Sequence, residues 1–414
     1  MPASTAEFTA NGRSYRPPAR PLAVVCLDGS ADEYLDAALA RGHMPRLATW
    51  LAAGAFRTMA RGALPSFTNV NNASIVTGAP PSVHGISGNF FLDPQSGDAV
   101  MMNSARYLRA GTIPAAAARS GRAVAIVTAK EKLRDILSSR LDGIAISSEK
   151  ARDARRETHG IDDVERLVGA PTPEIYSAEA SLWVLRAGVA LLAAGRADFL
   201  YLSLTDFVQH KFAPEDAGAL EFFAAIDHEL GRLVDLGCVV GATADHGMNA
   251  KQMADGSPHV IWLETLLRDE VHPEIRVILP ITDPYVVHHG ALGSLAVVHL
   301  PDAALVPRVA RRLLELDGVT EVHDRETAAR KLELPADRIG DLVVLAGRDV
   351  VLGRSPEHHD LRAVMTGLRS HGGRYEEMVP LFLSESLRAD FVPRAAGDPR
   401  NFDVFDYTLN GAQR

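Results

Sequence analysis

Several short stretches of the sequence place carboxylate and imidazole side chains where they can bind a metal ion. In TDFVQH, Asp206 and His210 are four residues apart, so both lie on one face if a strand passes directly into a helix. Mixed carboxylate and imidazole groups suit a zinc-like divalent ion, and six of them are enough for two ions. Two such ions about 4 Å apart can hold the attacking and leaving sides of a displacement at phosphorus. The six candidate ligands are Asp28, Asp206, His210, Asp245, His246 and His371.

Residues 64–78, LPSFTNVNNASIVTG, combine Thr68 with three asparagines in a run that Pro65 and Gly78 close. The run is too polar for a core strand and too free of charge for an ordinary solvated loop. We therefore expect a turn that presents Thr68, with the amide side chains satisfying the backbone around it. A metal ion can lower the pKa of the Thr68 hydroxyl and make it a nucleophile, so Thr68 is both the candidate catalytic residue and a further candidate ligand.

Taken singly, each of these residues has a simpler explanation. An aspartate and a histidine four residues apart often form a surface ion pair, and an aspartate after a strand often caps a helix. A lone loop histidine or turn threonine needs no catalytic role. The joint occurrence of LDG, FTN, TDFVQH, ADHG and SHGG in one chain favours the metal site.

The three aspartates follow short apolar runs that are typical of buried strands. PLAVVCLDG, ADFLYLSLTD and GCVVGATADHG each carry one of them at the end, and longer amphipathic runs such as AEASLWVLRAGVALLAAG separate these stretches. Strands that alternate with helices predict βαβ units, and therefore an α/β fold with a largely parallel central sheet flanked by helices. Because ligands of open α/β sheets bind beyond the carboxyl ends of the strands, we expect Asp28, Asp206 and Asp245 to meet at one edge.

At 414 residues the chain exceeds what one hydrophobic core usually organises. Residues 275–360 change to a compact strand-helix-strand-helix-strand pattern without acids at the strand ends. We expect this segment to be a small inserted α+β cap, with residues 20–274 and 361–414 forming the two parts of the catalytic core. The charged and irregular stretch 140–175 indicates a surface excursion.

The composition limits the partners of the protein. Hydrophobic residues make up 47% and charged residues 23% of the chain, which supports a sizeable core. A formal charge of −9 argues against nucleic acid, whose phosphates are held by a surplus of lysine and arginine. The N-terminus has no apolar signal segment and no run is long enough to span a bilayer, so we expect a cytoplasmic protein without a membrane partner.

The ordered motifs resemble the alkaline phosphatase superfamily over nearly the whole chain, from CLDG through LPSFTNVNNASIVTG and TDFVQHKF to SHGGRYEEMVPL. The resemblance implies an alkaline-phosphatase-like core. It assigns Asp206, His210 and His371 to a first metal ion. It assigns the nucleophile and the remaining ligands to a second ion, which would be held by Asp28, Thr68, Asp245 and His246.

Within that superfamily, SGNFF and TAKEKL are similar to stretches of hydrolases that cleave the carbon–phosphorus bond of phosphonoacetate, a small-molecule phosphonate, to give acetate and phosphate. The resemblance implies a phospho-threonine intermediate, two Zn²⁺ per chain with Mn²⁺ or Fe²⁺ as alternatives, and a homodimer. It also implies that Lys130 and Lys132 bind the substrate carboxylate and that Asn89 donates to a phosphoryl oxygen. Spacing alone equally allows the two lysines to begin a solvated helix.

Other functions fit part of the pattern. A zinc-dependent phosphodiesterase, nucleotide pyrophosphatase or phosphomonoesterase of the same superfamily would share the metal site, and Phe90 and Phe91 are candidates for a slot that holds a nucleotide base. A mutase of the superfamily and a metal-binding module without turnover are further alternatives, although structural zinc sites are usually closed and rich in cysteine. The paired histidines at 288–289 and 358–359 match no ligand position, and we expect them at the surface or behind the ligands.

Overall fold

A seven-stranded sheet forms the centre of the larger part of the molecule, in the strand order β4-β19-β10-β3-β9-β7-β8. The computed structural model describes residues 7–283, 290–362, 364–365 and 367–413. Within the sheet, neighbouring strands from β10 to β8 are parallel, whereas β19 is antiparallel to both β10 and β4. The predicted α/β fold with a largely parallel sheet is confirmed. Its strands are β3 (Leu22–Cys26), β4 (Arg57–Arg61), β7 (Val124–Thr128), β8 (Ile144–Ser147), β9 (Phe199–Ser203), β10 (Val239–Thr243) and β19 (Met378–Leu383).

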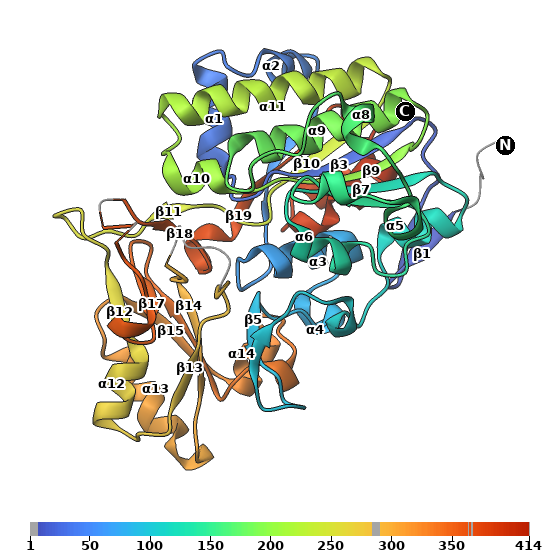
Figure 1. Cartoon of the computed structure of the whole chain (residues 1–414). Coiled ribbons are helices and arrows are strands. Elements are labelled where there is room, and N and C mark those ends of the chain that lie inside the picture. Colours follow the sequence, from blue (N-terminus) through green and yellow to red (C-terminus); the bar gives the residue numbers. More distant parts are fainter. Residues whose placement is uncertain (1–6, 284–289, 363, 366, 414) are drawn as a thin grey trace.

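Helices cover both faces of this sheet (Figure 1). All five residues of β3 are buried, because Ala23 and Val25 pack into the core on one face while Val24 and Cys26 pack into the core on the other. The first face carries α1 (Asp32–Ala40), α2 (Pro45–Ala52), α9 (Ala178–Ala193) and α11 (Ala217–Asp235). The second face carries α3 (Thr68–Thr77), α5 (Ile113–Arg119), α6 (Glu131–Leu137) and α16 (Val404–Asp406).

The strand register brings the three aspartates to one edge. Cys26 at the end of β3 lies opposite Ser203 at the end of β9 and opposite Thr243 at the end of β10. Asp28, Asp206 and Asp245 follow these aligned ends within two or three residues. The meeting of strand ends that the sequence predicts is therefore present, and it results from parallel pairing in one register.

A second, four-stranded antiparallel sheet lies outside the core, with the order β13-β14-β16-β15. Figure 1 shows it, together with adjoining helices, as a separate lobe beside the core. We call residues 260–353 the inserted lobe; its sheet falls inside the range 275–360, and β12 and α12 precede that range. The lobe comprises β12 (Val260–Trp262), α12 (Leu263–Glu270), β13 (Arg276–Ile278), β14 (Leu295–His299), α13 (Val306–Leu314), β15 (Val319–Asp324), α14 (Arg325–Lys331), β16 (Leu342–Ala346) and β17 (Val351–Gly353).

Shorter elements complete the chain. β11 and β18 pair antiparallel where the chain leaves for the inserted lobe and returns from it. No helix in the described part of the chain is long and apolar enough to cross a bilayer. The remaining α-helices and strands are β1 (Phe8–Ala10), β2 (Arg13–Tyr15), α4 (Pro81–His84), β5 (Phe90–Leu92), β6 (Ala99–Met101), α7 (Arg156–His159), α8 (Val164–Val168), α10 (Phe207–Lys211), β11 (Asn249–Ala250), β18 (Arg369–Ser370) and α15 (Val392–Ala395).

Two local expectations from the sequence are wrong. Residues 68–77 form the helix α3 rather than a turn, and all ten are buried. The helix ends at Gly78 because this residue adopts a left-handed conformation with φ 64°. The stretch 140–175 is not wholly a surface excursion, since residues 144–147 form the buried edge strand β8 of the main sheet.

A fully buried ion pair connects the segments near the three aspartates at the carboxyl ends of the strands. Lys251 Nζ lies 2.8 Å from Glu376 Oε1 and donates a hydrogen bond of 2.7 Å to the carbonyl oxygen of Arg348 in the inserted lobe. Both side chains are 0% exposed. The backbone amide of Gly373 donates to Glu376 Oε2, and that of Gly247 donates to the Glu376 carbonyl oxygen. The pair therefore joins the loops that follow His246 and His371 to each other and to the lobe.

Removing one member of this pair should destabilise the fold strongly. We expect Lys251→Met to lower the free energy of unfolding by about 3–5 kcal/mol, because Glu376 would keep an uncompensated buried charge. Urea denaturation of the two proteins measures the difference. Lys331→Met, at an exposed position of α14, is the matched control and should change the free energy by less than about 0.5 kcal/mol. Equal effects of the two substitutions would contradict the structural role of the pair.

Candidate active site

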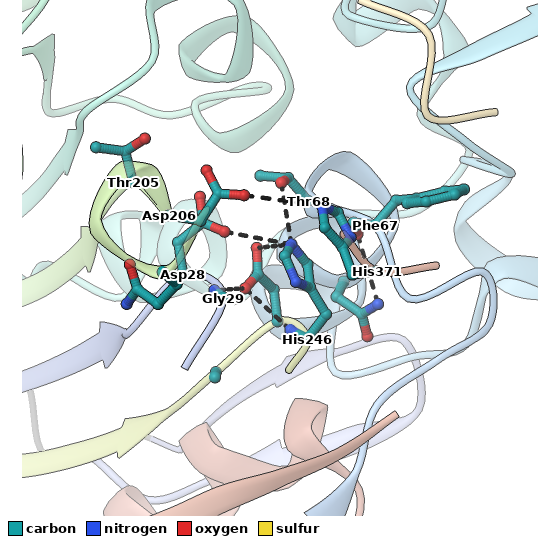
Figure 2. A network of polar contacts seen from close by, with 12 residues as sticks. Asp28, Gly29, Phe67, Thr68, Thr205, Asp206, His246 and His371 are labelled. Atoms are coloured by element: carbon teal, nitrogen blue, oxygen red, sulfur yellow. Dashed lines mark hydrogen bonds and ion pairs between the residues drawn. The ribbon is translucent and has the colours of Figure 1, made fainter. Parts of the chain in front are cut away.

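The structure gathers the six predicted ligands into two buried groups, and Figure 2 labels Asp28, Asp206, His246 and His371 among them. Within each group the ligand atoms lie within 4.8 Å of one another. The two groups adjoin, because the imidazole rings of His246 and His371 stack with their centroids 3.5 Å apart. The first group is Asp206, His210 and His371, and the second is Asp28, Asp245 and His246. The family resemblance divided these six residues in the same way, and it also assigned Thr68 to the second set.

The first group is built where β9 passes into α10. Asp206 precedes the helix and His210 lies one turn later, so that His210 Nε2 is 3.0 Å from Asp206 Oδ2. His371 Nε2 approaches the same oxygen to 3.7 Å. The Nδ1 atoms of His210 and His371 each donate to a backbone carbonyl oxygen, of Arg369 and Ser66 respectively, at 2.8 Å. This hydrogen bonding fixes both rings with Nε2 facing the aspartate, which is the orientation that a metal ligand requires.

The second group has the same construction. His246 Nδ1 donates to the carbonyl oxygen of Gly247 at 2.9 Å, and His246 Nε2 lies 3.3 Å from Asp28 Oδ1. That Asp28 oxygen is buried and accepts no hydrogen bond from the described residues. Gly29 has φ 70°, and a Cβ there would lie 2.6 Å from Asp206 Cβ, so the DG sequence is required for the aspartates to approach. A cysteine-free set of oriented imidazole and carboxylate groups fits divalent cations of the zinc type.

The buried carboxylates at the carboxyl ends of the strands favour the binding of cations. Burial, and then the neighbouring Asp28, raise the pKa of Asp245 to about 8. Lys130 Nζ lies 2.7 Å from Asp28 Oδ2 and 3.2 Å from Asp206 Oδ1. Burial alone would lower the pKa of Lys130, but Asp206 and Asp28 outweigh it and raise that pKa above its ordinary value. Burial would likewise raise the pKa of Asp206, but Lys130 and His210 hold it well below its ordinary value.

Thr68 is the first residue of α3, and its Oγ1 lies 3.5 Å from His246 Nε2. The N-terminus of a helix stabilises negative charge, since its first N–H groups have no partner within the helix. One of these donors, the Asn69 amide, is taken by Asn89 Oδ1 at 3.1 Å. That bond orients Asn89 so that its amino group is the donor left for a ligand beside Thr68.

The asparagines of α3 divide their tasks. Asn71 behaves as the sequence predicts, since its side chain bonds both the amide and the carbonyl oxygen of Ala63. Asn72 has a role that the sequence did not reveal, because its Nδ2 donates to Asp245 Oδ2 at 3.1 Å. Asn72 Oδ1 in turn accepts from Tyr201 and Ser203 of β9. Asn72 therefore fixes a candidate ligand to the helix that carries Thr68.

A cavity of about 290 Å³ opens over the two groups. Thr68, Asn89, Lys130 and Lys132 all line it, so the predicted substrate-binding residues are brought together with the candidate nucleophile. Several other residues that line the cavity were not predicted from the sequence. These are Ala129, Glu131, Glu149, Ile175, Tyr176, Thr205, Ile281 and Asp283.

Neither Phe90 nor Phe91 is among the described residues that line this cavity. Phe91 packs edge-to-face on Tyr107 with ring centroids 5.2 Å apart, and Phe90 packs on an apolar cluster of the inserted lobe. The expectation that they form a slot for a base is therefore wrong. His359 bonds the carbonyl oxygen of Gly290 away from the cavity, and His288 and His289 lie outside the described residues.

The fold and the paired ligand groups agree with the comparisons to known proteins. Residues 22–374 match the family of type I phosphodiesterases and nucleotide pyrophosphatases. The chain belongs to this family and is a hydrolase of the metal-dependent alkaline phosphatase superfamily.

Within this class, the chain is similar to one solved enzyme over its full length. It is 46% identical to phosphonoacetate hydrolase from Sinorhizobium meliloti 1021, in crystal structures with phosphonoformate and with phosphonoacetate, and the match covers 99% of this chain and 100% of that one at a TM-score of 0.93. Murine ectonucleotide pyrophosphatase / phosphodiesterase 5 is 17% identical, with 88% of this chain and 87% of that chain covered at a TM-score of 0.57. The murine protein supports the shared fold alone.

Metal loading should stabilise the protein through both groups. We expect metal-free protein to bind two zinc ions per chain and to gain about 2.7 kcal/mol of stability from each site at free zinc one hundred times its dissociation constant. His210→Ala and His246→Ala should each remove one ion. Elemental analysis after gel filtration, with thermal unfolding, measures both effects. His228→Ala, at an exposed position of α11, is the control. Two bound zinc ions in both His210→Ala and His246→Ala would refute the assignment of these histidines as metal ligands.

Proposed function

We propose that this protein hydrolyses phosphonoacetate to acetate and phosphate. The observation that carries the proposal is the single cavity, in which a hydroxyl at a helix N-terminus and two lysines adjoin two candidate metal-binding groups. The similarity to a phosphonoacetate hydrolase, at 46% identity over 99% of the chain, supports the same substrate. A substrate with a phosphonate at one end and a carboxylate at the other suits a cavity in which two lysines adjoin candidate metal-binding groups.

The resident metals in this proposal are two Zn²⁺ ions, with Mn²⁺ or Fe²⁺ as alternatives that the same ligands accept. The first would be held by Asp206, His210 and His371. The second would be held by Asp28, Thr68, Asp245 and His246. When bound, such ions lower the pKa of the coordinated hydroxyl and neutralise charge on phosphoryl oxygens.

Thr68 acts as the nucleophile in this mechanism. Its hydroxyl gives up its proton to solvent, Oγ1 attacks phosphorus in line, the carbon–phosphorus bond breaks, and the electron pair leaves with the carbon. The helix N-terminus stabilises the negative oxygen before attack, and the amino group of Asn89 donates to a phosphoryl oxygen as charge develops there. Water then cleaves the phospho-threonine and releases phosphate, which restores the Thr68 hydroxyl.

The carbon leaving group needs help, because a simple carbanion is a very poor leaving group. The adjacent carboxylate can delocalise the charge as an enediolate, which a proton then converts to acetate. Lys130 and Lys132 line the cavity and place positive charge where this species forms. Stabilisation that appears only in the transition state raises kcat rather than only lowering KM.

Ester hydrolysis is the second candidate function, since the family description names phosphodiesterases and pyrophosphatases. The same nucleophile and metals would serve it. A nucleotide would require a surface for its base, and Tyr176 is the aromatic side chain among the described lining residues.

The cytoplasmic location and the homodimer stay predictions.

Phosphate release tests the substrate directly. We expect zinc-loaded protein to release phosphate from phosphonoacetate much faster than from a nitrophenyl phosphate monoester or a nitrophenyl nucleotide diester, and chelator-treated protein to release none. Only phosphonoacetate offers the lysines a carboxylate that accepts the leaving electrons. A preference for either ester would favour the second candidate function.

The nucleophile can be tested separately. Thr68→Ala should reduce kcat by at least about a thousandfold, since no other oxygen takes the place of Oγ1. Thr68→Ser is the conservative control and should retain part of the activity. Both variants should keep most of their bound zinc, which elemental analysis checks. Turnover by Thr68→Ala near the wild-type rate would exclude Thr68 as nucleophile.

A further inference from the structure

We infer that Asp283 of the inserted lobe positions the Lys132 ammonium group and thereby sets the preference for substrates that carry a carboxylate. The inference rests on the proposed function. Asp283 is 3% exposed, and its Oδ2 contacts Lys132 Nζ directly. Both residues line the cavity above the candidate metal groups. Asp283 is thus a positioning residue that acts through Lys132.

The two lysines have different surroundings. Lys130 directs its ammonium group to Asp28 and Asp206, which belong to the two candidate metal groups. Lys132, two residues later in the first turn of α6, pairs instead with Asp283 from the lobe. Lys132 is therefore the lysine whose ion pair comes from the lobe rather than from a candidate metal ligand.

Lys132 needs such a partner to remain a fixed cation. It lies near the N-terminus of α6, where the helix dipole disfavours positive charge, and it is close to a second ammonium group. Burial and then Lys130 lower the pKa of Lys132 to about 7. The negative charges of Asp206, Asp28 and Glu149 oppose both effects, and the contact with Asp283 adds a buried carboxylate beside the ammonium group. An ammonium group has three donors, so pairing with Asp283 still leaves donors for a substrate carboxylate.

The same contact gives the lobe a part in substrate choice, although none of its described residues belongs to a candidate metal group. Ile281, two residues before Asp283, also lines the cavity, so the segment after β13 forms one wall of it. A phosphoryl group bound at Thr68 does not require this wall. A carboxylate bonded through Lys132 does require it.

Ligand binding separates this role from a general structural one. Dissociation constants of zinc-loaded wild type and Asp283→Asn should be measured by calorimetry for phosphonoformate, which has a carboxylate, and for inorganic phosphate, which has none. We expect the constant for phosphonoformate to rise about tenfold, as for the loss of one charge-assisted hydrogen bond, and the constant for phosphate to change less than twofold. Asp317→Asn, an exposed acid elsewhere in the lobe, is the control.

A double-mutant cycle completes the test. In a Lys132→Met background, Asp283→Asn should have no further effect on phosphonoformate binding, because the group that it positions is gone. Equal weakening for both ligands, additive effects in the cycle, or no change in Asp283→Asn would each overturn the inference. Wild type that binds phosphonoformate no better than phosphate would overturn it as well. Wild type that shows the binding preference without releasing phosphate from phosphonoacetate would instead refute the proposed function and leave the role of Asp283 standing.

Discussion

Three carboxylates buried side by side are the constraint on which this structure depends. Asp28, Asp206 and Asp245 lie at adjoining strand ends, away from water, where unpaired negative charges would be very costly. The surrounding residues meet that cost by supplying oriented imidazoles, an ammonium group and backbone amides. The histidine Nδ1 atoms are tied to carbonyl oxygens, so the rings keep their orientation whatever lies at Nε2. Buried carboxylates and oriented imidazoles therefore suit the binding of divalent cations, independently of the substrate.

The sequence was sufficient to predict the candidate ligands because each aspartate follows an apolar run of strand length. Parallel pairing then converts three distant positions in the chain into neighbours, a step that follows from the fold class alone. The histidines were identified by short spacings to these aspartates or by glycine-rich loops. Local chemistry and a simple topological rule therefore agree at this edge.

Other parts could not be predicted, for physical reasons that differ from residue to residue. Helix α3 has no exposed face, because all ten residues are buried and many of them are polar, so the usual amphipathic pattern of a helix is missing. Asn72 looks like any other amide in the run, and its bond to Asp245 exists only because β9 and α3 pack together. Asp283 and Tyr176 reach the cavity from segments that are remote in the chain. Nothing in their immediate neighbours marks them.

The short ladder between β11 and β18 has a further consequence for how such a protein can diversify. Asn249 pairs with Ser370 and Ala250 with Arg369, so the chain departs for the inserted lobe and returns at one closed point just after His246 and just before His371. Insertions or deletions within the inserted lobe leave the β11–β18 ladder in place, and therefore both histidines keep their positions. The lobe segment that lines the cavity can therefore change during evolution while the residues of the candidate metal groups and Thr68 stay the same.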